Sequence, residues 1–261
     1  PAIFGGETVA QLFVGRDSNV SDVYGLKSGK HFVNSLQDNI RHRGAMDRLL
    51  SDRAQVDVSE RVQDILRAYA IGDWQSEPYH QHQNFAENRY ETVKEATNRV
   101  MDRHGAPPEA WLLCVEYVVY VLNRTAHKTI GGITPLQFLT GRVPDISALL
   151  RFRFWQLVYY KVDEEECKDW PSASTERLAW FAGISDSVGN AMTMKLINCE
   201  TRAEIFRSRV RSADESAERN LRVDQNDFSS GESESTPPSL LRSKTEKEAE
   251  ALKNATADAL N

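Results

Sequence analysis

Two acidic residues of this chain lie where a metal-dependent reaction could use them. Asp52 ends the apolar run of residues 46–52, whose pattern predicts a short buried strand that closes in a polar turn. Glu87 ends the segment HQHQNFAE, where a polar loop enters a predicted long helix. Carboxylates at a strand end and at a helix start are ingredients of a two-metal phosphoryl-transfer site. Helix capping and compensation of the helix dipole explain both acids equally simply.

Other acidic and imidazole side chains are weaker candidates for metal ligands. Asp17 and Asp22 flank a predicted hairpin turn, and turn chemistry explains both of them. His80 and His82 have the spacing of a possible metal pair. We interpret the two histidines as polar loop residues instead, since no further ligand of a zinc site accompanies them.

Basic residues form two groups that could contact phosphate. Arg41, Arg43, Arg48 and Arg53 lie before and around Asp52. A second group alternates along one predicted strand and should share one face of it: Arg207, Arg209 and Arg211. Such stripes suit contacts with nucleic-acid phosphates, and a solvated strand edge explains the second group as well.

The overall charge does not favour a nucleic-acid partner by itself. The 261 residues have a net charge of −6, and residues 214–261 hold 11 acidic and 6 basic side chains, a net of −5, which leaves −1 for the residues before them. A nearly neutral body can hold local basic patches but has no strong electrostatic footprint.

Cysteine usage and hydropathy exclude several protein classes. The three cysteines have no paired spacing and no Cys-x-x-Cys occurs, which favours a reducing compartment and argues against a structural zinc site. The longest apolar stretch, residues 111–122, contains Glu116 and is too short for a membrane span. No signal peptide is found, and a chain that begins with Pro1 is expected to be a fragment or a processed piece.

The first 150 residues alternate strand-like and helix-like patterns. Apolar runs at 8–14 and 20–26 enclose the turn sequence GRDSN, which is a hairpin signature. Helical spacing is found at 30–43, 58–71, 84–104 and 109–123, and further strands are predicted at 46–52 and 73–76. This order predicts an α/β fold in which helices flank a mixed sheet.

The remaining residues change character twice. Short β-like runs at 155–162, 179–184, 191–196 and 203–207, with turn sequences between them, predict a small β-barrel over residues 151–212. Residues 213–261 are rich in Ser, Glu, Asp and Lys and predict a disordered acidic tail. The chain therefore divides into segments 1–150, 151–212 and 213–261.

Several separated strings, in one order, resemble the integrase of copia-type retrotransposons. They are SDR at 51–53, HQHQNFAE at 80–87, ITPLQFLTG at 133–141, FAGIS at 181–185 and RSRVR at 207–211. The likeness spans roughly residues 5–212. It implies a ribonuclease-H-like catalytic core followed by a small barrel. The implied activity is 3′-end processing of the element's DNA and its strand transfer into host DNA.

The resemblance also implies site residues, a cofactor and partners. Asp52 and Glu87 would be two of three catalytic ligands for Mg²⁺ or Mn²⁺. Lys94, seven residues after Glu87 on the same helix face, would contact the DNA end, although an exposed lysine beside Glu91 is the simpler account. Further nucleic-acid contacts are expected from Arg53, His82, Arg207, Arg209 and Arg211. The expected partners are element and target DNA and further copies of the chain, in the nucleus and without a membrane.

The chain departs from the family pattern at defined places. The family's first catalytic aspartate lies on a strand that is expected here at or before Pro1, and its zinc-binding N-terminal module is missing. Phe85, Asn88 and Arg53 stand where a small residue or proline, a basic residue and an asparagine are common. These departures predict an inactive fragment. They leave open a non-catalytic nucleic-acid-binding or interaction module and, less favoured, a simple nuclease of the same fold.

The acidic tail is expected to be separable from the rest of the chain. Removal of residues 214–261 should leave the thermal midpoint nearly unchanged, because so polar a segment buries little apolar area. The same truncation should strengthen DNA binding at low salt, because it removes net negative charge. Calorimetry and a salt titration of DNA binding measure the two effects, and a clear loss of stability would show that the tail packs on the body.

Overall fold

A computed structural model describes residues 2, 6–51, 60–75, 85–162, 174–214 and 219–223. The chain divides into two compact units, Pro1–Ser216 and Ala217–Asn261. The described residues form a mixed α/β structure whose order of helices and strands follows the predicted one. The predicted tail lies mostly outside the described residues, so its disorder stays a prediction.

The predicted hairpin is confirmed at the start of the chain. Strands β1 (Val9–Val14) and β2 (Ser21–Leu26) pair antiparallel, with Val14 opposite Ser21. In the turn between them Asn19 has a φ of 58°, a left-handed conformation that Asn adopts more readily than most residues. Asn19 is also buried, and its amide reaches the loop after helix α5, where Nδ2 donates to Thr129 Oγ1 at 2.6 Å. A turn that the sequence predicted as a surface feature is therefore anchored to a distant loop.

A helix-linked pair of parallel strands follows the hairpin. Helix α1 (Phe32–Arg43) leads into strand β3 (Arg48–Ser51), and helix α3 (Glu60–Ala68) precedes strand β4 (Gly72–Gln75). The strands pair from Arg48–Gly72 to Ser51–Gln75, which puts their carboxyl ends at one edge. Apolar residues of α1, β3 and α3 form one core cluster: Phe32, Leu36, Ile40, Leu49, Val62, Ile65, Leu66 and Ile71. The strand that precedes Asp52 is thus held by this cluster through Leu49.

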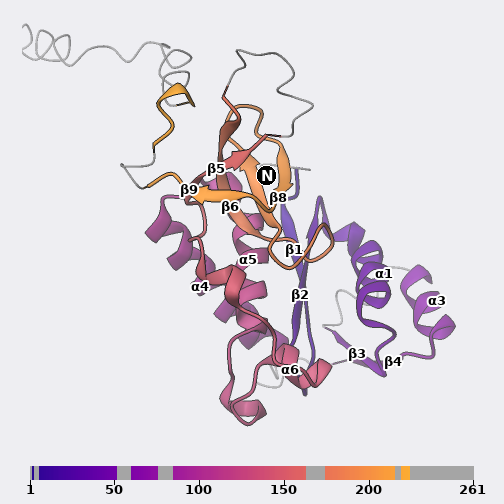
Figure 1. Cartoon of the computed structure of the whole chain (residues 1–261). Helices are drawn as coiled ribbons and strands as arrows, with labels where there is room; N and C mark the ends of the chain where they lie inside the picture. The colour runs from indigo at the N-terminus through magenta and orange to yellow at the C-terminus, as the bar shows by residue number, and fades with distance from the viewer. Residues whose placement is uncertain are drawn as a thin grey trace, which may run out of the picture. The chain divides into compact units, whose positions relative to one another are not determined.

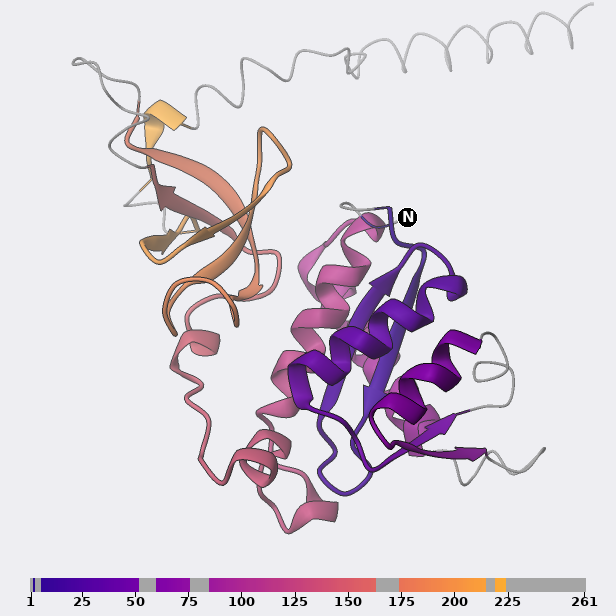
Figure 2. The ribbon, with the colours of Figure 1, turned by 90° about the vertical axis from the view of Figure 1, so that its right-hand side faces the viewer.

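Two long helices cover the other face of the hairpin. Helix α4 (Phe85–His104) contacts β1, and after the short helix η3 (Pro108–Ala110) helix α5 (Trp111–Asn123) contacts β2. Figures 1 and 2 show the hairpin between α1 on one side and α4 with α5 on the other. The two faces follow from strand alternation, because Asp22 of β2 bonds to the end of α1 while its neighbour Ser21 bonds to α4 and α5.

An extended segment joins α5 to the C-terminal sheet. It contains η4 (Lys128–Ile130), α6 (Pro135–Thr140) and η5 (Ser147–Leu150). The pair Thr134-Pro135 predicts a helix start with Pro at its first position, and the structure confirms it, because Thr134 caps α6 by accepting a hydrogen bond from the Gln137 backbone N–H. Among described residues, no helix is both long and apolar enough to cross a bilayer.

The C-terminal sheet has five antiparallel strands, but its closure into a barrel is not confirmed. Strands β5 (Leu157–Lys161), β6 (Glu176–Ile184), β7 (Met194–Asn198), β8 (Glu204–Arg207) and β9 (Val210–Ser212) are ordered β8-β7-β6-β5-β9. The end strands β8 and β9 are not paired with each other in this described sheet. It is a curved, open sheet around a core that includes Phe152, Phe181 and Leu196.

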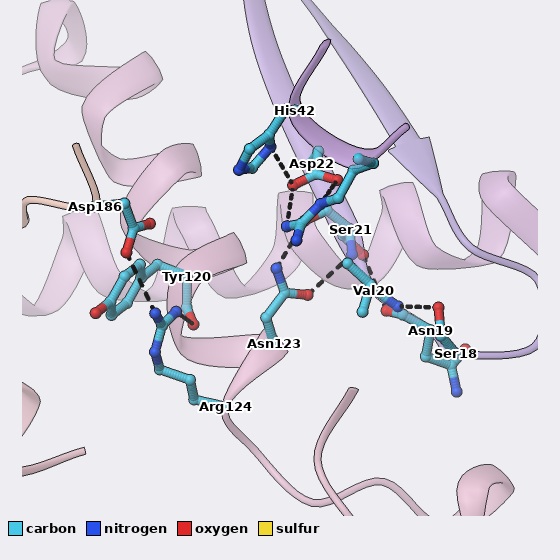
Figure 3. Close-up of polar contacts among 11 residues, drawn as sticks. Ser18, Asn19, Val20, Ser21, Asp22, His42, Tyr120, Asn123, Arg124 and Asp186 are labelled. Atoms are coloured by element: carbon cyan, nitrogen blue, oxygen red, sulfur yellow. Dashed lines mark hydrogen bonds and ion pairs between the residues drawn. The ribbon is translucent and has the colours of Figure 1, made fainter. Parts of the chain in front are cut away.

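A side-chain amide closes the outer edge of the hairpin. Asn123, the last residue of α5, accepts a hydrogen bond from the Ser21 N–H at 2.9 Å and donates one to the Ser21 carbonyl at 2.7 Å (Figure 3). These are the two backbone groups that a neighbouring strand would engage. Both residues are buried, so the amide satisfies a peptide that water cannot reach. The contact fixes the end of α5 to the start of β2.

Replacement of Asn123 by Ala should destabilise the chain by about 2–4 kcal/mol, because it leaves the Ser21 N–H and carbonyl buried without acceptor and donor. The matched control is Asn98→Ala, at an exposed position of helix α4, which should change stability by less than about 0.5 kcal/mol. Urea unfolding followed by circular dichroism measures both. Equal effects of the two substitutions would show that the hydrogen bonds between Asn123 and the Ser21 backbone make no specific contribution to stability.

Candidate functional site

The structure describes one of the two proposed catalytic carboxylates. Glu87 lies in the first turn of α4, its side chain is exposed, and within the described residues it makes no ion pair or hydrogen bond. Asp52 lies outside the described residues, directly after Ser51 at the end of β3. Arg53, His80 and His82 also lie outside them. The geometry of the proposed pair is therefore untested, while Glu87 itself is free to accept a cation.

Metal ligation is not established by the described residues alone. Among them no group of three or more His, Cys, Asp or Glu side chains could hold an ion. Glu87 has the hard oxygen atoms that Mg²⁺ prefers, but a single carboxylate does not hold two divalent ions. The proposed Mg²⁺ or Mn²⁺ site thus depends on side chains that join Glu87 from elsewhere.

The sequence pattern predicts a core-facing side of α4 made of Tyr90, Val93, Thr97 and Val100, and the structure differs from it in part. Val93 and Thr97 are buried as expected, but Tyr90 is 47% exposed and Arg89 is buried in its place. The stripe at 89, 93 and 97 has exact four-residue spacing, so helical periodicity could have found it. An aromatic ring is more often buried than a guanidinium, so residue type alone favours Tyr90 over Arg89 as the buried residue.

Lys94 lies on the solvent side of α4 and pairs with its own helix. Its Nζ atom is 3.7 Å from Glu91 Oε1 and 6.0 Å from the centre of the Tyr90 ring. The Lys94 and Glu91 side chains are each 56% exposed, so water screens the pair and its stabilising effect is small. The geometry matches the simpler account of an exposed lysine beside Glu91. It leaves the ammonium able to exchange that carboxylate for a phosphate.

The three C-terminal arginines do not share one strand face, contrary to the prediction. Arg207 ends β8, Arg209 lies exposed between the strands, and Arg211 belongs to β9. The chain turns between the two short strands, and strand alternation does not continue through a turn. Arg211 donates two hydrogen bonds of 2.7 Å to Glu176, and Arg207 lies 5.9 Å from the centre of the Tyr160 ring.

Asp22 is an ion-pair residue of the hairpin and not part of the turn. Arg43, at the end of α1, donates to both Asp22 oxygens at 2.8 and 2.6 Å, and His42 Nδ1 lies 3.8 Å from Asp22 Oδ1. The hydrogen bond that Arg43 donates to Asp22 raises the pKa of Arg43. Asp17 lies exposed in the turn, as predicted. The carboxylate of Asp22 is thus occupied by a guanidinium, which explains it without a metal.

A cavity of about 510 Å³ lies along β2, α5 and strands β6 to β8. Its basic side chains each have a carboxylate within 4 Å: Arg43 with Asp22, Arg124 with Asp186, and Lys195 with Glu116. Figure 3 shows the Arg124 guanidinium beside the Tyr120 ring and bonded to Asp186. Because these charges are internally compensated, the cavity offers no net positive surface for nucleic acid.

Cys114 is a core residue and no nucleophile. It is fully buried in α5, and burial raises the pKa of its thiol to about 12. The thiol is therefore neutral at physiological pH and unreactive. Cys199 is partly buried, and Cys167 lies outside the described residues.

Comparisons with known proteins give distant structural likenesses. No family model and no curated protein matches the chain. The simian T-cell lymphotropic virus intasome, solved in complex with the PP2A regulatory subunit B56 gamma, is similar with a TM-score of 0.42 and 14% identity over 78% of this chain and 74% of that one. Two forms of the HTLV-2 integrase catalytic core with magnesium, trimeric and dimeric, give TM-scores of 0.41 and 0.40, at 15% and 16% identity, over 49% and 50% of this chain and 82% and 83% of theirs. All three TM-scores lie below 0.5, so these likenesses are too distant to assign a function.

Replacement of Asp22 by Asn should lower stability by roughly 1–2 kcal/mol, because it breaks a two-bond ion pair whose side chains are 13% and 26% exposed. It should leave Mn²⁺ binding unchanged, since Asp22 is not a ligand in our account. Asp17→Asn, at an exposed turn position, is the control and should change neither property. Chemical unfolding and electron paramagnetic resonance of Mn²⁺ measure the two. Loss of Mn²⁺ binding in Asp22→Asn alone would make Asp22 a ligand.

Proposed function

We propose that this chain is the catalytic-core segment of a copia-type retrotransposon integrase, acting in 3′-end processing and strand transfer of DNA. The proposal rests first on the ordered strings that resemble that family over roughly residues 5–212. The single structural observation that supports it best is Glu87. It is an exposed carboxylate without a partner in the described residues, and it lies in the first turn of a 20-residue helix.

The second carboxylate of the proposed site is Asp52. Strand β3 is described as far as Ser51, beside the end of the parallel strand β4, and Asp52 is the next residue of the chain. A carboxylate at the end of such a strand and Glu87 at a helix start come from separate elements, as ligands that converge on a metal pair do. We assign these two ligands to the chain and leave a third unassigned.

The divalent metal, when bound, would activate the attacking oxygen and stabilise the leaving 3′ oxygen. The residues of the chain would hold and orient the substrates. Lys94 would exchange its weak pairing with Glu91 for the phosphate of a DNA end. Further contacts are proposed for Arg53, His82, Arg207, Arg209 and Arg211, of which Arg209 is the exposed one in the described set. DNA, further copies of the chain and a nuclear location complete the proposal.

A second candidate is a non-catalytic module that binds nucleic acid or a protein. Two observations favour it: Phe85 and Asn88 depart from the family pattern, and the net charge is −6. The two candidates differ in one measurable property. A catalytic core binds divalent metal through Glu87 and Asp52, whereas a remnant does not.

Metal binding by the intact chain tests the proposal. Mn²⁺ should bind weakly to the chain, and Asp52→Asn or Glu87→Gln should each remove that binding, as measured by electron paramagnetic resonance. The matched control is Glu95→Gln, an exposed carboxylate of the same helix paired with Arg99, which should bind like the parent chain. Mn²⁺ binding that survives both Asp52→Asn and Glu87→Gln would favour the non-catalytic module.

Strand transfer gives a second, independent test. The 261-residue chain should join no DNA ends, because two carboxylates hold two divalent ions poorly against their mutual repulsion. A version extended at its N-terminus by a strand bearing an Asp should show metal-dependent joining, and the same extension bearing Asn should not. If the unextended chain joins DNA and Asp52→Asn stops it, the third ligand lies within the 261 residues.

A further inference from the structure

One buried cation of helix α4 has no anionic partner in the part of the chain that the structure describes. Arg89 is only 7% exposed and lies two residues after Glu87, on the side of α4 that faces the hairpin. No carboxylate lies within ion-pair distance of it among the described residues. A guanidinium does not lose its proton in a protein, so burial cannot be relieved by neutralisation. The buried charge therefore needs hydrogen-bond acceptors or an anion to compensate it.

The contacts of Arg89 leave part of its guanidinium free. Its Nε donates to Ser21 Oγ at 3.0 Å, while its buried Nη2 has no hydrogen-bond acceptor. Burial without a compensating charge lowers the pKa of Arg89. A buried N–H of a charged group that lacks an acceptor costs more than a neutral one. Arg89 Nη2 is therefore a charged donor whose hydrogen bond is unmade.

Ser21 supplies a second donor at the same place. Its hydroxyl accepts from Arg89 and makes only a long 3.3 Å bond to the Asn19 carbonyl. A hydroxyl proton rotates freely, so it can turn from that carbonyl to a better acceptor. The Ser21 backbone is held by Asn123, which keeps this hydroxyl in position against the guanidinium. Two donors from separate elements thus meet at one point.

The local field favours an anion there. Arg89 is the fifth residue of α4, a helix of 20 residues, whose N-terminal end has partial positive charge from unpaired backbone N–H groups. Anions bind at such helix starts when a donor side chain accompanies them.

We propose that Arg89 Nη2 and the Ser21 hydroxyl form a binding site for a small free oxyanion of the phosphate class. The burial of Arg89 decides the size of the ligand. A DNA phosphate is flanked by sugars on both sides and cannot reach a guanidinium that is 7% exposed, so the ligand is a free anion, and its binding requires the side chains that cover Nη2 to make room for it. This site requires neither a metal nor DNA ends, and so it goes beyond the proposed integrase activity.

Inorganic phosphate is the probe, added to the full chain at constant ionic strength. The thermal midpoint should rise by about 3–5 °C at roughly ten times the Kd, since the anion binds only the folded chain. Arg89→Met should abolish this rise. The matched control is Arg99→Met, an exposed arginine of the same helix, which should keep it. No rise in the parent chain, or an equal rise in Arg89→Met, would refute the site.

Two further measurements keep the test informative if Arg89→Met does not fold. Arg89→Lys and Ser21→Ala should each reduce the phosphate-dependent rise, because each removes one donor. In nuclear magnetic resonance spectra, the Arg89 Nε–H signal should shift with phosphate and stay in place with a short DNA duplex. A shift with DNA but not with phosphate would make nucleic acid the ligand and the free-anion proposal wrong. Glu87→Gln should keep the phosphate response, so this outcome is separate from the catalytic proposal.

Discussion

The structure of the N-terminal unit depends on one buried peptide, that of Ser21. Asn123 bonds to its N–H and carbonyl, and Arg89 bonds to its hydroxyl, so that β2, α4 and α5 meet within one residue. Apolar packing alone lets helices slide over a sheet, because it has no direction. Hydrogen bonds to a buried peptide do have direction, and leaving them unmade is costly. They set where α4 begins relative to the hairpin, and with it the position of Glu87.

Charges near this peptide fall into two kinds. Around the cavity the basic groups are matched by acids, as in the pairs Arg43–Asp22 and Arg124–Asp186, which holds the elements together without creating a charged surface. On α4 the opposite holds, because Glu87 is an unpaired exposed anion and Arg89 an unpaired buried cation. Unpaired charges cost stability and persist most readily where a ligand compensates them. Among the described residues, this contrast supports our proposal of a site at the start of α4 rather than in the cavity.

Local patterns were sufficient for most of the secondary structure. The hairpin β1–β2, helices α1, α4 and α5, and the Thr134 cap of α6 were each predicted from spacing, turn residues and capping chemistry. These signals act between residues close in the chain, and burial of the resulting apolar faces confirmed them. The shared strand face expected for Arg207, Arg209 and Arg211 failed because the chain turns after Arg207, and no local signal distinguishes an exposed turn from a polar strand edge there.

The sequence by itself determined the order of elements, the mixed α/β class and the candidates Asp52 and Glu87. The tertiary structure alone decided that Asp22 pairs with Arg43, that Asn123 closes the edge of β2, and that Arg89 is buried where Tyr90 was expected. Asn123 and Ser21 are 102 residues apart, and Arg89 and Ser21 are 68 apart. A periodic pattern shows which side of a helix is apolar, but not which polar group across the fold will satisfy a buried donor. That depends on the three-dimensional meeting of distant segments.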